Sequence, residues 1–422
     1  MTSSAWIAII IFIIVLLCII TEVINRTLAA MAGAMAMVFL GIIDSEAVAS
    51  YIDFNTIGVL IGMMLLVSTV KKSGLFEFLA IYTAKLAKGG TGKILIGFSI
   101  ITAVLSAILD NVTTVLLIGP MTLVITQILQ INPVPFLISE ILASNIGGTS
   151  TLIGDPPNIM IGSAAGLGFS DFVINLFPVI VVILSITLLI LYFLFRKSLA
   201  VDSSKKDAIM ALDPLKSITD YPLLYKSLAV IFLVLIGFIF HDKIGVSSSI
   251  VALTGATIIL IIGKQNVEEI FHSVEWLTIG FFCALFVIVG GLEEVGIISL
   301  LATYLMDATA GNPTLMVIVI LWLAAIVSSF LDNIPFVATL IPLIITMGQN
   351  GIDITPLWWA ISLGACLGGN GTLIGASANL VLANIGTRNG HKISFGYYFK
   401  YGFPLMLISI VISMIYLLLF YV

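Results

Sequence analysis

Charge is the first thing this sequence lacks. Only 9% of its 422 residues are charged, against 60% that are hydrophobic, whereas a soluble globular protein carries about 25% charged residues. A water-soluble chain of this size could not cover so much apolar surface, so the composition indicates an integral membrane protein. The net charge of -5 is spread along the chain and offers no basic patch, so no nucleic-acid partner is expected.

Cysteine is also scarce, and the familiar catalytic motifs are missing. The three cysteines, Cys18, Cys283 and Cys366, lie in apolar runs without pairing or metal spacing, which argues against a disulfide framework or a zinc site. No nucleophile elbow, phosphate loop or nucleotide fingerprint occurs. We therefore expect neither an enzyme nor a cofactor, and transport driven by an ion gradient unless a separate ATPase subunit supplies energy.

What the sequence has in abundance is long apolar runs. The first, from residue 6 to 20, has no basic region before it and no small-residue cleavage site, so it predicts a retained helix rather than a signal peptide. A spanning helix needs about 20 mostly apolar residues. Full-length spans are expected at residues 5–24, 28–44, 54–70, 172–195, 226–241, 247–263, 274–291 and 396–421.

Four further apolar stretches are interrupted by Gly, Pro, Asn and Asp. Residues 94–130 and 313–348 predict re-entrant hairpins, and residues 134–166 and 355–387 predict broken transmembrane helices. Irregular backbone is tolerated at membrane depth only where protein or a water-filled cavity covers it. The predicted fold is therefore an all-α polytopic membrane protein with interrupted helices.

The positions of Lys and Arg predict the orientation. With the N-terminus outside, 16 of the 17 basic residues fall in inside segments and only Lys243 falls outside, as expected for a cytoplasmic membrane. The polar linker 196–222 is then cytoplasmic. It divides the chain into a first repeat, 1–195, and a second, 223–422.

The two halves repeat one another. Leu109-Asp110-Asn111 recurs 222 residues later as Leu331-Asp332-Asn333, and the glycine-rich run 147–154 recurs as 368–375. Chance similarity between two apolar stretches would align Leu and Ile residues rather than these Asp-Asn and Gly-Gly pairs in the same order. Each half makes an odd number of crossings before its twin begins, so the repeats are inverted, as in secondary transporters with a site near the midplane.

The interruptions carry the candidate chemistry. Asp110 and Asp332 stand at the hairpin tips, where a charge costs roughly 2.5–3.5 kcal/mol on insertion scales; they either cap the second hairpin helix or hold a cation or proton. The glycine-rich breaks free carbonyl groups and expose a helix N-terminus, although small residues also serve close packing. The candidate substrate and ion ligands are Asp110, Asn111, Thr113, Thr114, Asn145, Gly148, Thr149, Ser150, Thr151, Asp155, Asn158, Asp332, Asn333, Asn370, Thr372 and Asn379, with Na⁺ expected at Asp110, Asn111, Asp332 and Asn333.

Two acids lack a twin in the other repeat. Asp155 matches Ala376 and Glu140 matches Ile361. Asp155 lies beside the first break and is a second candidate for a titrating group. Glu140 either shares that role or makes a structural hydrogen bond.

With these motifs in place, the chain resembles the ion transporter superfamily. It is most similar to the branch of arsenite permeases, NhaD-type sodium–proton antiporters and melanosomal P proteins. The likeness rests on Leu109-Asp110-Asn111-Val112-Thr113-Thr114, Asn145-Ile146-Gly147-Gly148, Ile153-Gly154-Asp155-Pro156-Pro157-Asn158 and their counterparts in the second half. It implies a scaffold and a transport domain, a homodimer and an elevator-like motion.

The resemblance leaves several substrates open. The first is a proton-coupled exporter of arsenite or a similar oxyacid, and the second is a Na⁺/H⁺ antiporter. A citrate or dicarboxylate carrier is the third; related dicarboxylate carriers have Ser-Asn-Thr where this chain has Asp110 and Asp332. A carboxylate there repels a dianion, and the sequence predicts no Arg or Lys at mid-membrane. A non-transporting membrane scaffold is the fourth alternative.

Overall fold

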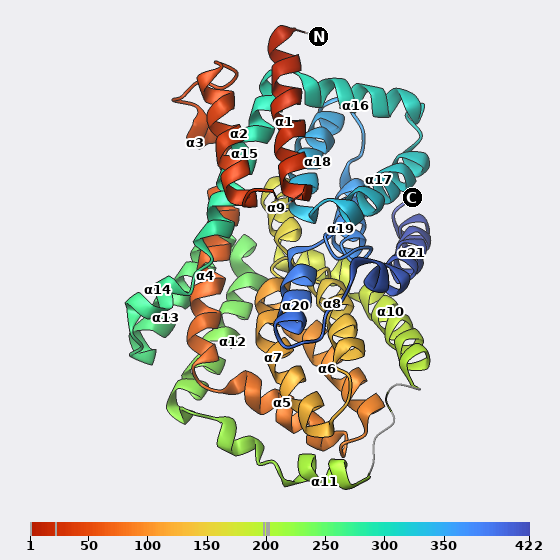
Figure 1. Ribbon diagram of the computed structural model, residues 1–422. Coiled ribbons are helices and arrows are strands. Elements are labelled where there is room, and N and C mark those ends of the chain that lie inside the picture. Colours follow the sequence, from red (N-terminus) through yellow and green to blue (C-terminus); the bar gives the residue numbers. More distant parts are fainter. Residues whose placement is uncertain (1, 22, 197–198, 200–202) are drawn as a thin grey trace.

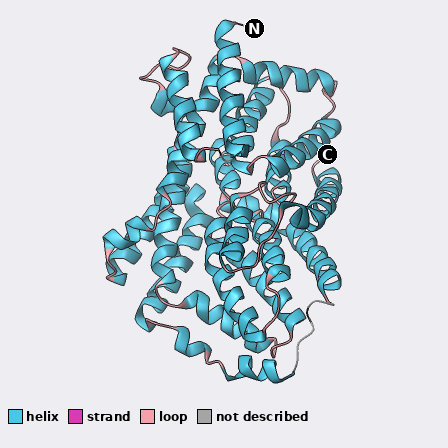
Figure 2. Ribbon diagram, viewed as in Figure 1, coloured by secondary structure: helices cyan, strands magenta, loops and turns pink. Residues whose placement is uncertain are grey.

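A computed structural model describes residues 2–21, 23–196, 199 and 203–422, and over these ranges the chain forms helices and no strands (Figures 1 and 2). Nine of the described helices are long and apolar enough to cross a membrane. Large hydrophobic side chains remain exposed along them, for example on α1 (Ser3–Thr21) and α10 (Phe169–Phe195). This exposure fits a surface that faces lipid rather than water.

Both predicted hairpins and both predicted breaks are confirmed. The first hairpin pairs α6 (Thr91–Ile108) with α7 (Asn111–Leu129), and the second pairs α17 (Pro313–Phe330) with α18 (Asn333–Gln349). The first broken helix consists of α8 (Val134–Gly148) and α9 (Pro156–Ala165). The second consists of α19 (Thr355–Gly368) and α20 (Ser377–Arg388). The Gly, Pro, Asn and Asp residues that interrupt the apolar stretches thus lie where the helices end.

The two repeats are inverted in space. Figure 1 places α5 (Leu75–Leu86) near one end of the molecule and its twin α16 (Ile297–Ala308) near the other. The same small-residue crossing occurs in each half, where α8 lies against α6 and α19 lies against α17. The halves also interlock, because α7 packs against α20 and α18 packs against α9. Tips and breaks of both repeats therefore meet in the middle.

The remaining helices surround this centre. Most predicted spans are confirmed: α4 (Phe54–Lys71), α12 (Tyr221–Ile244), α15 (Trp276–Glu294) and α21 (Phe395–Phe420), together with α1 and α10. α4 packs against α13 (Ser248–Gly263), and α15 packs against α2 (Arg26–Phe39). Short helices that no sequence pattern predicted also occur: α3 (Val48–Tyr51), α5, α11 (Ser203–Ala211), α14 (Val267–His272) and α16.

Two predicted full-length spans were too long. The span predicted at 28–44 is α2, with 14 residues, and the span predicted at 247–263 is α13, with 16. At 1.5 Å per residue neither reaches the ~30 Å of a bilayer core. The apolar run after α2 continues through Ile42 and Ile43, but Gly41 takes a left-handed φ of 69° and ends the helix.

The linker 196–222 is partly helical. It contains α11 and a 3₁₀ turn, Pro214–Ser217, while residues 197–198 and 200–202 lie outside the described part. α11 packs against α5 and α7, so the linker is attached to the first repeat.

Candidate functional site

Equivalent hydrogen bonds fix the breaks of the two repeats. Asn158 donates from Nδ2 to the Thr151 carbonyl at 2.9 Å, and Asn379 donates to the Thr372 carbonyl at 2.9 Å. Each amide thus bonds back to carbonyls that the unwound backbone leaves without helical partners. This duplicate arrangement confirms the alignment of the repeats at the level of single bonds.

The predicted hydroxyl ligands mostly serve local structure. Thr149 donates to the Asn145 carbonyl at 2.7 Å and Ser150 to the Gly147 carbonyl at 2.6 Å. Thr151 donates to the Ala107 carbonyl at 2.6 Å, and Thr372 to the Ser329 carbonyl at 2.5 Å. These last two bonds are again twins, and both tie a break to the first helix of its hairpin. Gly148 allows close contact, since a Cβ there would lie 2.5 Å from the Gly154 carbonyl oxygen.

The centre of the molecule is a cluster of amides. Asn145 donates from Nδ2 to Asn370 at 2.9 Å and to Asn379 at 2.8 Å, and its oxygen accepts from Asn111 at 3.1 Å. All four side chains are buried. Four of the predicted residues, drawn from both breaks and the first hairpin, therefore form one network.

Both hairpin acids cap the helix that follows. Asp110 accepts from the Thr113 backbone N–H at 2.7 Å and from the Thr113 hydroxyl, and Asp332 accepts from the Ile334 N–H at 3.2 Å. The capping interpretation is thus confirmed for both. Capping uses one oxygen of Asp332 and leaves the other for a second contact.

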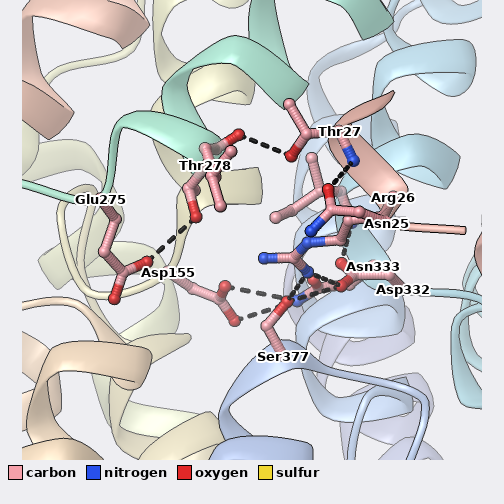
Figure 3. A network of polar contacts seen from close by, with 11 residues as sticks. Asn25, Arg26, Thr27, Asp155, Glu275, Thr278, Asp332, Asn333 and Ser377 are labelled. Atoms are coloured by element: carbon pink, nitrogen blue, oxygen red, sulfur yellow. Dashed lines mark hydrogen bonds and ion pairs between the residues drawn. The ribbon is translucent and has the colours of Figure 1, made fainter. Parts of the chain in front are cut away.

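That second contact is with Arg26. Its guanidinium lies 3.1 Å from Oδ2 of Asp332 and also bonds to the Ser377 hydroxyl, which donates to Asp332 at 2.7 Å (Figure 3). Arg26 begins α2 and Ser377 begins α20. The prediction that no Arg or Lys would lie at the site was therefore wrong.

Asp155 lies between the repeats. It occupies the N-cap position of α9 but makes no cap bond; both of its oxygens instead accept from Asn333 Nδ2 at 3.3 Å (Figure 3). It lies within electrostatic reach of Asp332 and Asp110. Glu275, which precedes α15, lies within reach of Asp110 and Arg26. Asp332 and Glu275 thus lie within reach of the guanidinium, and Asp155 and Asp110 lie within reach of those two acids.

Glu140 stands apart from that group. It is buried and accepts from the Thr122 hydroxyl, while its other oxygen has no hydrogen-bond partner in the described part of the chain. The contact with Thr122 therefore supports the alternative that Glu140 makes a structural hydrogen bond. Two other buried oxygens, Asn111 Oδ1 and Thr114 Oγ, likewise lack a partner among the described residues.

Several functional candidates were missed by sequence reasoning. Arg26, Ser377 and Glu275 all contact or face the acids, and the Ser362 hydroxyl donates to Asn158 at 2.6 Å. Ser377 lies two residues after the second glycine-rich run and matches Pro156 beside the first, so its place in the repeat could have identified it. Arg26 gave none, because it lies 306 residues from Asp332.

Two crevices flank the centre and are related by the repeat. The first, about 450 Å³, lies between α4, α7 and the start of α15, and is lined by Ser68, Lys71 and Glu275. The second, about 340 Å³, has the equivalent residues Gly290, Glu293 and Asp53. The structure thus has a crevice for each half, between α4 and the hairpin helix α7 in the first repeat and between α15 and the hairpin helix α18 in the second.

The polar contacts of the residues lining the two crevices differ. At the first, Lys72 and Glu269 form an ion pair at 2.5 Å. At the second, the Tyr51 hydroxyl bonds to Glu294. Burial and this neighbouring acid raise the pKa of Tyr51 to about 12, so the phenol keeps its proton near neutral pH.

Comparison with known proteins gives consistent matches. A family profile described as citrate transporter (CitMHS) matches residues 16–364. A 46 kDa membrane protein of Mycobacterium leprae is 42% identical over an alignment of 420 positions that covers 97% of each chain. An uncharacterized transporter of Mycobacterium tuberculosis is 41% identical over the same shares.

More distant matches extend the picture. The human P protein is 33% identical over an alignment of 485 positions, gaps included, that covers 95% of this chain and 58% of that protein. The YdaH transporter of Alcanivorax borkumensis has the same fold, with a TM-score of 0.59, 15% identity and coverage of 99% and 98%. MtrF of Neisseria gonorrhoeae, which represents a class of antimetabolite efflux pumps, also has the same fold. Its TM-score is 0.59 at 14% identity, and the match covers 100% of this chain and 95% of MtrF.

Proposed function

Because the chain belongs to the citrate transporter family, and so to the secondary transporters, we propose that it carries a small oxygen-rich anion together with a cation. The observation that carries this proposal is the Arg26–Asp332 ion pair at the second hairpin tip, with Asp110, Asp155 and Glu275 in the same electrostatic network. A cation or proton at the acids lowers the repulsion that an incoming anion would meet.

The anion is assigned to the Arg26 side of the centre. A planar guanidinium binds carboxylates by paired hydrogen bonds, and here it already bridges Asp332 and Ser377. A cavity of about 340 Å³ opens beside it, lined by Asn25, Arg26 and Asp332. A citrate-class carboxylate suits this side better than neutral arsenous acid, which needs no guanidinium.

The coupling cation is assigned to the first hairpin. Asp110 supplies a carboxylate there, and the buried oxygens of Asn111 and Thr114 are without partners in the described chain. Oxygen donors of this kind suit Na⁺, and Asp155 offers a nearby proton acceptor. A Na⁺/H⁺ antiporter is the second candidate, since the acids outnumber the base.

Alternating access and orientation complete the proposal. The paired crevices are the expected routes to the two sides of the membrane, each opening when the hairpins and breaks move against α4 and α15. We place the N-terminus outside and the linker in the cytoplasm, as the distribution of Lys and Arg favours.

Transport by the purified protein in liposomes tests the assignment. Labelled citrate should enter under an inward pH or Na⁺ gradient, and Arg26→Gln should reduce uptake at least tenfold, because Asp332 then repels the anion. Arg26→Lys should keep part of the activity. Arg388→Gln, which removes an exposed guanidinium at the end of α20, is the matched control.

Other results would redirect the proposal. Arsenite uptake under the same gradients, without citrate uptake, would contradict the citrate assignment and favour a carrier of arsenite or a similar oxyacid. Proton release on adding Na⁺, lost in Asp110→Asn and independent of any anion, would establish antiport instead. Equal citrate uptake in Arg26→Gln and Arg388→Gln would remove Arg26 from the site.

A further inference from the structure

A further cavity lies away from the centre, at the base of the first hairpin. It measures about 650 Å³ and is formed by the loop before α6, the end of α10 and the linker helix α11. Its lining includes Lys88, Lys93 and Lys206, together with Thr91, Gly92 and Tyr192. None of the proposed transport residues contributes to it.

The described lining of this cavity is positively charged. Within the described ranges, no acidic side chain forms an ion pair with Lys88, Lys93 or Lys206. α6 begins at Thr91 without a side-chain cap, so the backbone N–H groups of its first turn add partial positive charge to the same cavity. Three ammonium groups and a helix N-terminus together favour a phosphate-like anion.

Backbone turns, a close contact and hydrogen bonds fix the walls of this cavity relative to one another. Lys88 and Gly89 take left-handed φ angles of 51° and 66°, which turn the loop toward α11. A Cβ on Gly89 would lie 2.8 Å from Lys206 Cβ, so the loop and the linker are in close contact. The Thr91 hydroxyl donates to the Leu199 carbonyl, and Lys85 donates to the Leu212 carbonyl at 2.7 Å, on either side of α11.

The surroundings identify the source of the anion. Beyond Tyr192, the end of α10 exposes Leu189, Phe193 and Leu194 at 58%, 54% and 52%. A ligand with its phosphate among the lysines would therefore have an apolar surface beside it for acyl chains. We propose that this cavity binds the headgroup of an anionic phospholipid.

Lipid binding to the detergent-purified full chain tests the proposal. Phosphatidylglycerol should raise the apparent melting temperature more than phosphatidylcholine does, because ligand binding to the folded state stabilises it. The triple variant Lys88→Gln, Lys93→Gln, Lys206→Gln should lose most of that difference. A control triple variant of equal charge, Lys205→Gln, Lys216→Gln, Lys264→Gln, should keep it.

Two further measurements separate the outcomes. Native mass spectrometry should show at least fivefold fewer phosphatidylglycerol adducts on the first triple variant, and a smaller reduction on Lys93→Gln alone. If inorganic phosphate gives the same protection without lipid, the site takes free phosphate and the lipid assignment fails. Equal stabilisation of both triple variants by phosphatidylglycerol would overturn the site itself.

Discussion

Asn145 joins three other buried amides at the centre of the molecule. Its amide contacts Asn111 of the first hairpin and Asn370 and Asn379 of the second break. A buried polar group left without a partner costs about 1–3 kcal/mol. One side chain therefore holds together segments from both repeats that the chain itself keeps far apart.

Asn145→Ala should destabilise the protein by roughly 2–5 kcal/mol, because three buried amides lose a partner at once. The check is the apparent melting temperature in detergent. Asn389→Ala removes an exposed amide at the end of α20 and should leave that temperature nearly unchanged. Equal effects of the two substitutions would show that the amide network adds nothing to stability.

The sequence predicted those features that depend only on neighbouring residues. Asp110 and Asp332 interrupt apolar runs, and interruption is a local property, so hairpins and breaks were predicted correctly. Arg26 begins a helix at the other end of the chain from Asp332, and one sequence carries no information on which distant residues meet. Arg26 was therefore missed because its contact with Asp332 is long-range, and not because the need for a basic residue was overlooked.

Among the elements, the hairpins and broken helices are held by two equivalent crossings. A Cβ on Gly147 would lie 2.2 Å from the Ala103 carbonyl oxygen, and one on Gly368 would lie 2.6 Å from the Ala325 carbonyl oxygen. Both glycines let α8 and α19 approach their hairpins at backbone distance. The unpredicted helices α5 and α16, by contrast, are only 12 residues long, too short to cross a bilayer core, so a search for spanning segments did not find them.

Gly147→Ala and Gly368→Ala should each separate a hairpin from its broken helix and cost about 1–3 kcal/mol by overpacking. Thermal unfolding, together with the yield of folded protein, measures the effect. Gly396→Ala, at the start of α21, meets no atom within 4 Å and is the matched control. Retention of full stability in both test variants would contradict the close approach.

Across the whole molecule, the two crevices predict opposite accessibility. In a background without native cysteines, Ser68→Cys lies in the first crevice and Ser163→Cys in the second. If the crevices open to different sides, a membrane-impermeant thiol reagent should label one from each side of sealed vesicles. Ser413→Cys, fully buried in α21, should react from neither side, and labelling of both test positions from one side would exclude separate routes.

The inverted repeat also has a consequence for the origin of the chain. Two halves with the same hydrogen bonds but opposite directions imply a half-length ancestor that inserted both ways round and paired with itself. In such a pair every residue of the centre was present twice. Residues that now occur once, such as Arg26 opposite Ser248 and Asp155 opposite Ala376, could arise only after the ancestral gene was duplicated, when each copy became free to specialise.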